Sequence, residues 1–281
     1  MLEKGPSQTA LGVTVLRAVH QLFDGSPKLL DDPVAPRLLG ESVVEKIRSN
    51  PGIFQSKRLL NLRSHVLLRS RYAEDCLEEA VSQGVTQYVI LGAGLDTFAY
   101  RQPAWARNLK IMEIDHPASQ AAKRDLLNAA GIPLPVNLEF LPVDLETVDL
   151  RSCLSQSSLR LHEPVFFSWL GVIVYLTPSA VENTFFSIAE MPENTGVVFS
   201  FSSGLLSGFD GQPTETQVRA AKLGEPWQTF YAPEAINDLL RASGFREIHF
   251  LDNAEAQQRY YADRPRDLPP PRRVSIGFAR V

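Results

Sequence analysis

The run 87–96 combines an apolar stretch with the small and acidic residues Gly92, Ala93, Gly94 and Asp96. Its apolar part is short and rich in β-branched side chains, which predicts a buried strand. The glycines allow the backbone to turn sharply and to approach a ligand closely. The residues after Asp96 are compatible with a helix. The run therefore predicts a strand, a glycine turn and a helix N-terminus, which together suit a bound nucleotide or nucleoside.

Thr97 stands where a dinucleotide-binding fingerprint would have its third glycine. A threonine side chain works against the close approach of a pyrophosphate. A ligand without phosphate, such as an adenosyl group, would still fit the loop. A tight turn with no ligand is the alternative interpretation of this segment.

Two acidic residues lie at the ends of the next two predicted strands. Asp115 ends the strand 109–115, about 20 residues after the glycines, where an acid can accept hydrogen bonds from both ribose hydroxyls. Asp144 lies near the end of the strand 138–145, where its carboxylate could accept from an adenine amino group while Leu145 packs on the ring. Either acid alone could cap a helix or sit in a solvated turn, but three successive strands with such ends favour a nucleoside site.

Composition sets the broad class of the protein. The chain has 281 residues, of which 44% are hydrophobic and 21% are charged, so it can bury a sizeable core. A net charge of −4 gives no indication of a nucleic-acid surface. Cys76 and Cys153 have no metal-ligand spacing, the five histidines form no ligand cluster, and no metal is expected. With no signal peptide or membrane-length apolar run in the sequence, we expect a cytoplasmic protein with reduced thiols and no membrane partner.

The pattern of elements predicts an α/β fold. Helical periodicity dominates residues 1–84, which we expect to form an N-terminal helical cap ending in a long amphipathic helix at 57–82. Strands and helices then alternate, which favours a mostly parallel sheet with helices on both faces. The expected strands are 87–91, 109–115, 138–145, 164–171, 196–202, 246–251 and 274–279. No boundary between domains is evident, so residues 1–281 are expected to form one domain, and no pattern indicates an oligomeric state.

The stretch 203–232 interrupts this alternation. It contains several glycines and prolines together with Phe209, Trp227, Phe230 and Tyr231. A glycine-rich aromatic insertion after a strand could form a lid over a ligand pocket. A packed surface loop is an equal alternative.

The motifs Leu-Gly-Ala-Gly-Leu-Asp-Thr at 91–97, Glu-Ile-Asp-His-Pro at 113–117 and Val-Asp-Leu at 143–145 resemble those of a known family. They are similar to motifs of the class I S-adenosylmethionine-dependent methyltransferases of the leucine carboxyl methyltransferase group, in its bacterial branch, common in actinobacteria. The same branch also fits the motifs Thr9-Ala10, Asp32-Pro33, Tyr175-Leu176-Thr177-Pro178 and Gly224-Glu225-Pro226. The resemblance covers nearly the whole chain. It implies a Rossmann-like sheet of seven strands with an antiparallel last strand, and S-adenosyl-L-methionine as cofactor.

The resemblance also implies roles for individual residues. Arg71 matches the arginine that binds the methionine carboxylate of the cofactor, and Asp115 matches the ribose ligand. Glu113 is the rival of Asp115, because side chains two apart on a strand share a face. The remaining residues of the expected cofactor site are Gly92, Ala93, Gly94, Asp96, His116, Asp144, Leu145 and Trp169.

One position departs from the family pattern. The eukaryotic protein-modifying members carry a glutamate in the fourth-strand motif, whereas this chain has Leu170. A protein C-terminus is therefore a doubtful substrate, and a small molecule is expected instead. Methyl transfer from a sulfonium is a displacement that chiefly needs alignment of the reactants.

We expect an O-methyltransferase acting on a carboxyl or phenolic oxygen. Tyr175 is the candidate catalytic residue, with plain packing as its alternative. Arg63 and Arg69 could attract an anionic substrate, although arginines on a helix are usually solvated. Two alternatives remain, an oxidoreductase using a nicotinamide dinucleotide and a non-catalytic protein that binds the cofactor.

Overall fold

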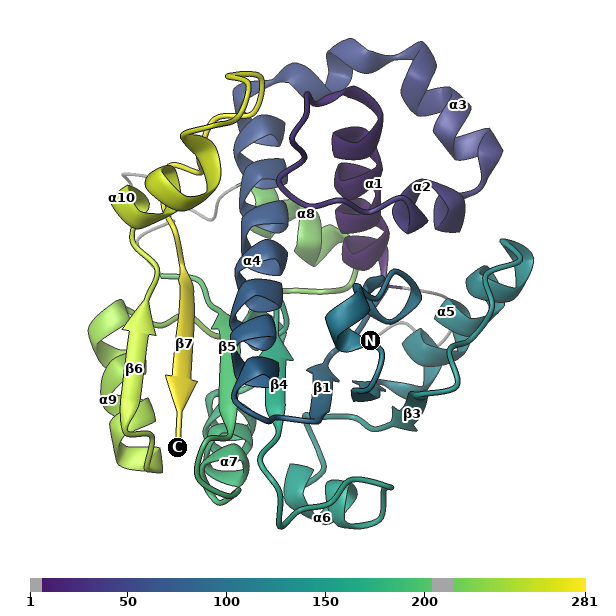
Figure 1. Ribbon diagram of the computed structural model, residues 1–281. Coiled ribbons are helices and arrows are strands. Elements are labelled where there is room, and N and C mark those ends of the chain that lie inside the picture. The colour runs from purple at the N-terminus through teal and green to yellow at the C-terminus, as the bar shows by residue number, and fades with distance from the viewer. Residues whose placement is uncertain (1–6, 204–214) are drawn as a thin grey trace.

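The computed structural model describes residues 7–203 and 215–281 (Figure 1). The helices are α1 (Gln8–Phe23), α2 (Val34–Leu39), α3 (Glu41–Ser49), α4 (Lys57–Ser82), α5 (Pro117–Ala129), α6 (Leu150–Ser155), α7 (Pro178–Ala189), α8 (Glu215–Lys222), α9 (Pro233–Ser243) and α10 (Asn253–Ala256). The strands are β1 (Gln87–Leu91), β2 (Lys110–Asp115), β3 (Leu138–Pro142), β4 (Phe166–Trp169), β5 (Gly196–Ser200), β6 (Glu247–Phe250) and β7 (Ile276–Arg280).

The strands form one seven-stranded sheet in the order β3-β2-β1-β4-β5-β7-β6. Strands β3, β2, β1, β4 and β5 run parallel, and β7 pairs antiparallel with both β5 and β6. The predicted α/β fold with an antiparallel last strand is therefore confirmed. The order reverses beside β1, between β2 and β4. In open parallel sheets, ligands bind at such a reversal, outside the carboxyl ends of the strands.

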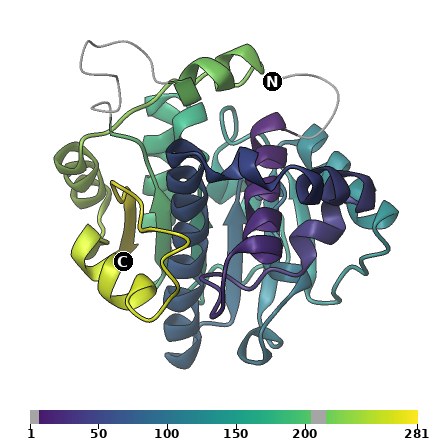
Figure 2. The same cartoon turned by 90° about the horizontal axis from the view of Figure 1, so that it is seen from above.

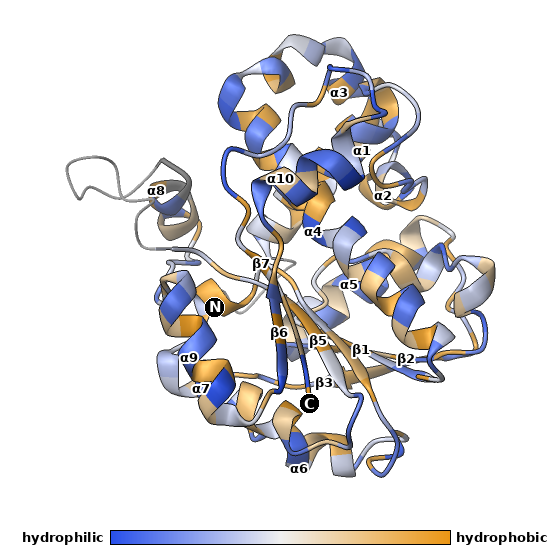
Figure 3. Cartoon of the chain, turned by 60° about the vertical axis from the view of Figure 1, so that its left-hand side comes forward, coloured by the Kyte–Doolittle hydropathy of each residue, from blue (hydrophilic) through white to orange (hydrophobic). Residues whose placement is uncertain are grey.

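Alternating side chains of the strands supply two cores. On one face, Val89 and Phe167 join the apolar sides of α6, α7 and α9. On the other face, Tyr88 and Phe166 join the apolar side of α4. Figure 3 shows the hydrophobic colour concentrated in the central strands and on the helix sides that face them. The central strands are thus covered on both faces, as parallel sheets require.

The N-terminal helices lie beyond the carboxyl ends of the parallel strands (Figure 1). Helix α1 packs against α2 and α4, and Figure 2 shows α4 between α1 and the C-terminal segment. On that second side, Ser64 of α4 lies 2.6 Å from the Tyr261 hydroxyl. Helix α4 therefore presents one side to the N-terminal helices and another to the C-terminal segment, a difference that decides which of its arginines can serve the site.

Three of the expected elements differ from the structure or extend beyond the residues that it describes. No α-helix follows the glycine turn, so the predicted helix N-terminus there is wrong; residues 98–100 form only a single 3₁₀ turn. Pro103 lies four residues after Ala99 and removes a helical donor, and proline also disfavours helical backbone at Gln102. The strand predicted at 138–145 ends at Pro142. The suggested lid at 203–232 falls partly outside the described residues, because 204–214 are not described.

Candidate active site at the carboxyl ends of the strands

The glycine loop after β1 has a backbone that only glycine adopts easily. Gly92 and Gly94 have φ angles of +62° and +48°, in the left-handed region. A Cβ added at residue 92 would overlap the Val172 side chain, and one added at residue 94 would lie 3.4 Å from the Ala10 Cβ. The loop is therefore a narrow backbone surface between the end of β4 and the start of α1. Ala93 fixes it to the sheet, since its N–H donates to Ile114 O at 3.0 Å.

Asp115 lies directly beside this loop at the end of β2. Its Oδ2 accepts from Gly94 N at 2.6 Å, and its Oδ1 accepts from His116 N at 2.7 Å. Burial raises the pKa of Asp115, while those two backbone donors lower it. A carboxylate has about four lone-pair sites, so each oxygen retains capacity for a further donor, such as a ribose hydroxyl.

Glu113, the rival acid, is engaged elsewhere. Its Oε2 pairs with Lys123 Nζ of α5 at 2.6 Å, and both side chains are fully buried. Burial raises the pKa of Glu113 to about 7, against the opposing effect of Lys123. Asp115, rather than Glu113, is the acid that lies against the glycine loop.

The other strand-end residues have local partners. The Asp144 Oδ1 accepts from Glu146 N at 3.0 Å, and Leu145 is buried. His116 caps α5, because its Nδ1 accepts from Ala118 N at 3.3 Å. Asp144 and His116 both follow strand ends on the same edge of the sheet as Asp115.

The structure separates the three arginines of α4 singled out in the sequence. Arg63 is fully buried and binds both oxygens of Asp24 at 2.9 Å, so it is part of the fold. The half-exposed Arg71 side chain pairs with Asp75 at 2.7 Å. Asp75 also accepts from the Tyr260 hydroxyl at 2.9 Å, so Arg71 lies on the side of α4 that faces the C-terminal segment. The structure does not bring Arg71 to the glycine loop.

Arg69 lies on the side of α4 that faces the strand ends. Its guanidinium touches Gly171, where an added Cβ would lie 2.5 Å from Nη1. Gly171 adjoins Val172, which covers Gly92. Within the described residues, Arg69 has no ion-pair partner, and its buried Nε has no hydrogen-bond acceptor. Burial and the neighbouring Arg17 lower the pKa of Arg69 to about 10, so it is cationic at neutral pH. An unpaired, partly buried guanidinium beside a glycine loop is suited to a ligand carboxylate.

Tyr175 lies in the 3₁₀ turn after β4 (Ile173–Tyr175). Burial raises its pKa, while Thr9, Trp227 and Arg69 lower it. The segment after α8 is bonded to this turn, because Gln228 N donates to Val174 O at 2.7 Å and Gln228 Nε2 donates to Tyr175 O at 2.6 Å. The described end of the insertion therefore lies against the candidate catalytic residue.

Glu225 joins that segment to the start of α1. It accepts from the hydroxyls of Ser7 and Thr9 and from the backbone N–H groups of Gln8 and Thr9. A carboxylate at a helix N-terminus satisfies free N–H groups and interacts favourably with the helix dipole. These contacts hold α1 and the 225–231 segment together above the glycine loop.

Thr97 belongs to a buried ionic network that the sequence did not predict. The Thr97 hydroxyl donates to Asp32 at 2.7 Å and accepts from Arg17 at 3.1 Å. Arg17 also binds Asp96 Oδ2 at 3.1 Å, and Arg101 binds the Thr97 hydroxyl at 3.1 Å. Asp96 thus fastens the loop to α1 through Arg17. Only the polar Thr97 and the Asp32-Pro33 pair were visible as signals in the sequence, because the partners are far apart along the chain.

Trp169 ends β4, but its ring lies in the core. The side chain is fully buried and packs edge-on against Phe185, with 5.1 Å between ring centroids.

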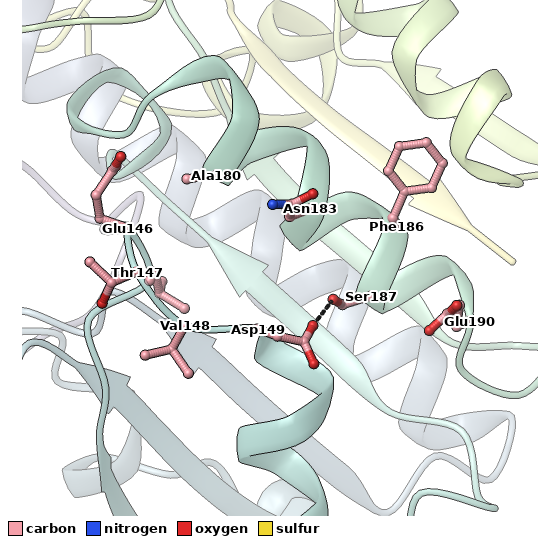
Figure 4. Close-up of a pocket in the computed structure, with 10 residues that line it drawn as sticks. Glu146, Thr147, Val148, Asp149, Ala180, Asn183, Phe186, Ser187 and Glu190 are labelled. Carbon is pink, nitrogen blue, oxygen red and sulfur yellow. Dashed lines mark hydrogen bonds between the residues drawn. The ribbon is translucent and has the colours of Figure 1, made fainter.

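A separate pocket lies between the 145–149 loop and α7 (Figure 4). One side of it is closed by the 3.1 Å hydrogen bond from Ser187 to Asp149. Of the expected site residues, only Leu145 lines this pocket.

Two further observations concern metal ions and membranes. Among the described residues, no group of three or more His, Cys, Asp or Glu side chains is arranged to hold a metal ion. In residues 7–203 and 215–281, no helix is long and apolar enough to cross a membrane.

The geometry fits an S-adenosyl group. The positive-φ glycines present bare backbone, Asp115 keeps acceptor capacity beside them, and Arg69 offers an unpaired cation. A dinucleotide fits less well, because Thr97 takes the place of the third glycine and is bonded to Asp32.

Comparison with known proteins leads to the same cofactor. The family model described as leucine carboxyl methyltransferase matches residues 10–189. YktD of Bacillus subtilis, whose name places it among S-adenosyl-L-methionine-dependent methyltransferases, is 29% identical, with 95% of each chain covered. A Mycobacterium avium protein of the same description is 29% identical, covering 86% of this chain and 83% of its own.

Solved structures share the fold. A methyltransferase-like protein from Thermobifida fusca superposes with a TM-score of 0.58 at 14% identity, covering 98% of this chain and 95% of its own. A Streptomyces avermitilis protein gives 0.55 at 14% identity, covering 95% and 96%. The match to the leucine carboxyl methyltransferase model sets aside the nicotinamide-dependent oxidoreductase considered from the sequence. The chain belongs to the leucine carboxyl methyltransferase family and is an S-adenosyl-L-methionine-dependent methyltransferase.

Proposed function

We propose that the protein transfers the methyl group of S-adenosyl-L-methionine to a carboxyl or phenolic oxygen of a small molecule. The observation that carries this proposal is the protonation chemistry around Arg69. His65 and Tyr175 both interact electrostatically with Arg69, and neither is suited to remove a proton from a substrate at neutral pH. A carboxylate, which is already ionised at neutral pH, would need no such base, whereas a phenol would have to ionise before the transfer.

His65 lies one helical turn before Arg69 on α4. Burial, together with the Arg69 cation, lowers the pKa of His65 to about 3. A base with so low a pKa is poorly matched to a phenol or an alcohol, since proton transfer works best with a pKa near the working pH. Among oxygen acceptors, carboxylates are ionised at neutral pH without help.

Tyr175 also fails as a base, for the opposite reason. Burial raises its pKa from an ordinary value of about 10. The phenol therefore stays protonated at neutral pH and can donate a hydrogen bond. We assign it the role of a donor to the substrate.

For the cofactor, we propose three contacts by side chains of this chain. Arg69 binds the methionine carboxylate, Asp115 accepts from the ribose hydroxyls, and Asp144 with Leu145 contacts the adenine. The support for Arg69 is its unpaired guanidinium beside Gly171. The support for Asp115 is its position against Gly94. When bound, the cofactor supplies an activated methyl sulfonium, so these residues chiefly position it.

A small molecule is favoured over a protein C-terminus by two observations. Leu170 replaces the glutamate that protein-modifying members carry, and its half-buried side chain packs in the core beside α4. The 225–231 segment and the start of α1 are joined by Glu225 over the strand ends. That cover leaves less room for a folded partner.

The test uses radiolabelled S-adenosyl-L-methionine and four acceptor classes: small carboxylic acids, phenols, amines and a leucine-terminated peptide. Methyl esters are distinguished by release of volatile methanol in base, and products are identified by mass spectrometry. The proposal expects transfer to small acids or phenols. Transfer confined to amines or to the peptide would overturn it.

A further inference from the structure

We propose that the Trp227 indole N–H and the Tyr175 hydroxyl form the acceptor subsite, and that this subsite selects a small-molecule carboxylate. The inference rests on the proposed O-methyl transfer and goes further, because it names two specificity residues and chooses carboxylates over phenols. Two buried donors without a close acceptor, the Trp227 indole N–H and the Arg69 Nε, lie near Tyr175.

Trp227 is held in a fixed position by its neighbours. Next to it, the backbone and side chain of Gln228 bond to the carbonyls of Val174 and Tyr175. One residue further on, the Thr229 hydroxyl donates to Leu176 O at 2.5 Å. The indole also contacts Phe230, with 6.2 Å between ring centroids. Residues 227–229 thus run alongside residues 174–176, which places the Trp227 indole beside the Tyr175 phenol.

The Trp227 N–H has no acceptor at full hydrogen-bond distance within the ranges that the structure describes. Its Nε1 is buried, although the indole N–H lies close enough to the Tyr175 hydroxyl to lower the pKa of that phenol. The Nε of Arg69, which lies near Tyr175, likewise lacks an acceptor among the described residues. A buried unsatisfied donor costs about 1–3 kcal/mol, so such groups call for an explanation. Two of them flanking one tyrosine indicate that a ligand supplies the acceptors.

The charges around this point favour an anion. Arg69 is cationic, and the Tyr175 hydroxyl and Trp227 N–H can both donate. Two acids act here: Asp96, which pairs with Arg17, and Glu225, whose carboxylate is occupied by the hydroxyls and N–H groups at the start of α1. A carboxylate that is accepting several hydrogen bonds has little capacity to compete for the Trp227 and Tyr175 donors.

The subsite also fits the reaction. With Arg69 assigned to the cofactor, Trp227 and Tyr175 hold one oxygen of the substrate carboxylate. The other oxygen forms a bond to the methyl carbon as the sulfur–carbon bond breaks. The products are a methyl ester and S-adenosylhomocysteine, and no proton is transferred. A neutral His65 and a protonated Tyr175 are compatible with this step.

The experiment measures binding of benzoate, octanoate and phenol to the complex with S-adenosylhomocysteine by calorimetry. Trp227→Phe keeps an aromatic ring and removes the N–H, and Tyr175→Phe removes only the hydroxyl. Each variant should weaken carboxylate binding about tenfold, as expected for one lost hydrogen bond to a charged group. Affinity for S-adenosylhomocysteine should change less than about twofold. Trp105→Phe, in the core beside Phe98, is the matched control and should change neither affinity.

Several outcomes would overturn the proposal. Carboxylate affinity unchanged in both Trp227→Phe and Tyr175→Phe would remove the two residues from the subsite. Phenol bound with neither carboxylate bound would assign the subsite to phenols, and no binding of any probe would remove it altogether. O-methyl transfer is scored separately by product analysis. Transfer that persists at wild-type rates in both variants would therefore refute the subsite and leave the proposed function standing.

Discussion

Arg69 and Gly171 fit against each other so closely that residue 171 has no room for a side chain. A Cβ built there would lie 2.5 Å from one guanidinium nitrogen and 2.8 Å from the other. Gly171 also has a φ of +75°, which non-glycine residues rarely adopt. The glycine after β4 therefore sets the position of the arginine that we assign to the cofactor carboxylate.

Gly171→Ala should displace that guanidinium and weaken binding of S-adenosylhomocysteine by about tenfold or more, as for loss of a charge-assisted hydrogen bond. Gly84→Ala is the control, because Gly84 has a φ of +98° but nothing lies within 4 Å of an added Cβ. Both variants should lose stability from backbone strain. Calorimetric titration separates the effects, and equal affinities for the two variants would disconnect Gly171 from the cofactor.

Asp115 and Glu113 should respond differently to substitution. Asp115→Ala should weaken S-adenosylhomocysteine binding by about 2–3 kcal/mol, because two hydrogen bonds to a charged acceptor are lost. Glu113→Gln should leave affinity nearly unchanged and lower the melting temperature, because it leaves Lys123 buried without its ion pair. Titration and thermal unfolding of both variants check this. A larger affinity loss in Glu113→Gln would reverse the assignment.

The Thr97 hydroxyl should contribute to stability through the buried network. Thr97→Val keeps the shape of the side chain but leaves Asp32 without its 2.7 Å donor. The free energy of unfolding should fall by about 1–3 kcal/mol. Thr97→Ser retains a hydroxyl and should lose less. Denaturant unfolding of the pair measures the difference. Equal stabilities of the two variants would mean that the hydroxyl contributes nothing to the fold.

The lowered pKa of His65 predicts how the stability of the fold depends on pH. Its pKa is about 3 in the folded protein and about 6.5 in an unfolded chain, so the unfolded state binds more protons between these values. The His65 contribution to stability is therefore present above about pH 6.5 and is lost as the pH falls. Relative to wild type, His65→Gln should gain roughly 1 kcal/mol of stability per pH unit from pH 6 to pH 4. Parallel stability curves for the two proteins would show that His65 titrates normally.

Local patterns located the elements well. The strand Gln87–Leu91 and the helix Lys57–Ser82 have the predicted bounds, because each carries its own periodicity. The predicted sheet of seven strands with an antiparallel last strand was also confirmed. The lid at 203–232 stays a prediction, since residues 204–214 lie outside the described ranges.

The tertiary contacts of the site could not be read from spacing. Arg69 and Arg71 are two residues apart, about 200° around the helix axis. Both sides of α4 are covered by other segments, so amphipathicity did not show which arginine faces the strand ends. The network of Arg17, Asp32 and Thr97 joins residues up to 80 positions apart, and local sequence patterns carry no information about such contacts.

The most direct test compares Arg69→Lys with Arg71→Lys for binding of S-adenosylhomocysteine and of adenosine, by calorimetry. Lysine cannot reproduce the two-pronged hydrogen bonding of a guanidinium to a carboxylate, and adenosine has no carboxylate. Arg69→Lys should weaken S-adenosylhomocysteine binding about tenfold or more and leave adenosine binding unchanged, whereas Arg71→Lys should change neither. Selective loss in Arg71→Lys, or equal losses for both ligands in Arg69→Lys, would contradict the account of the cofactor site.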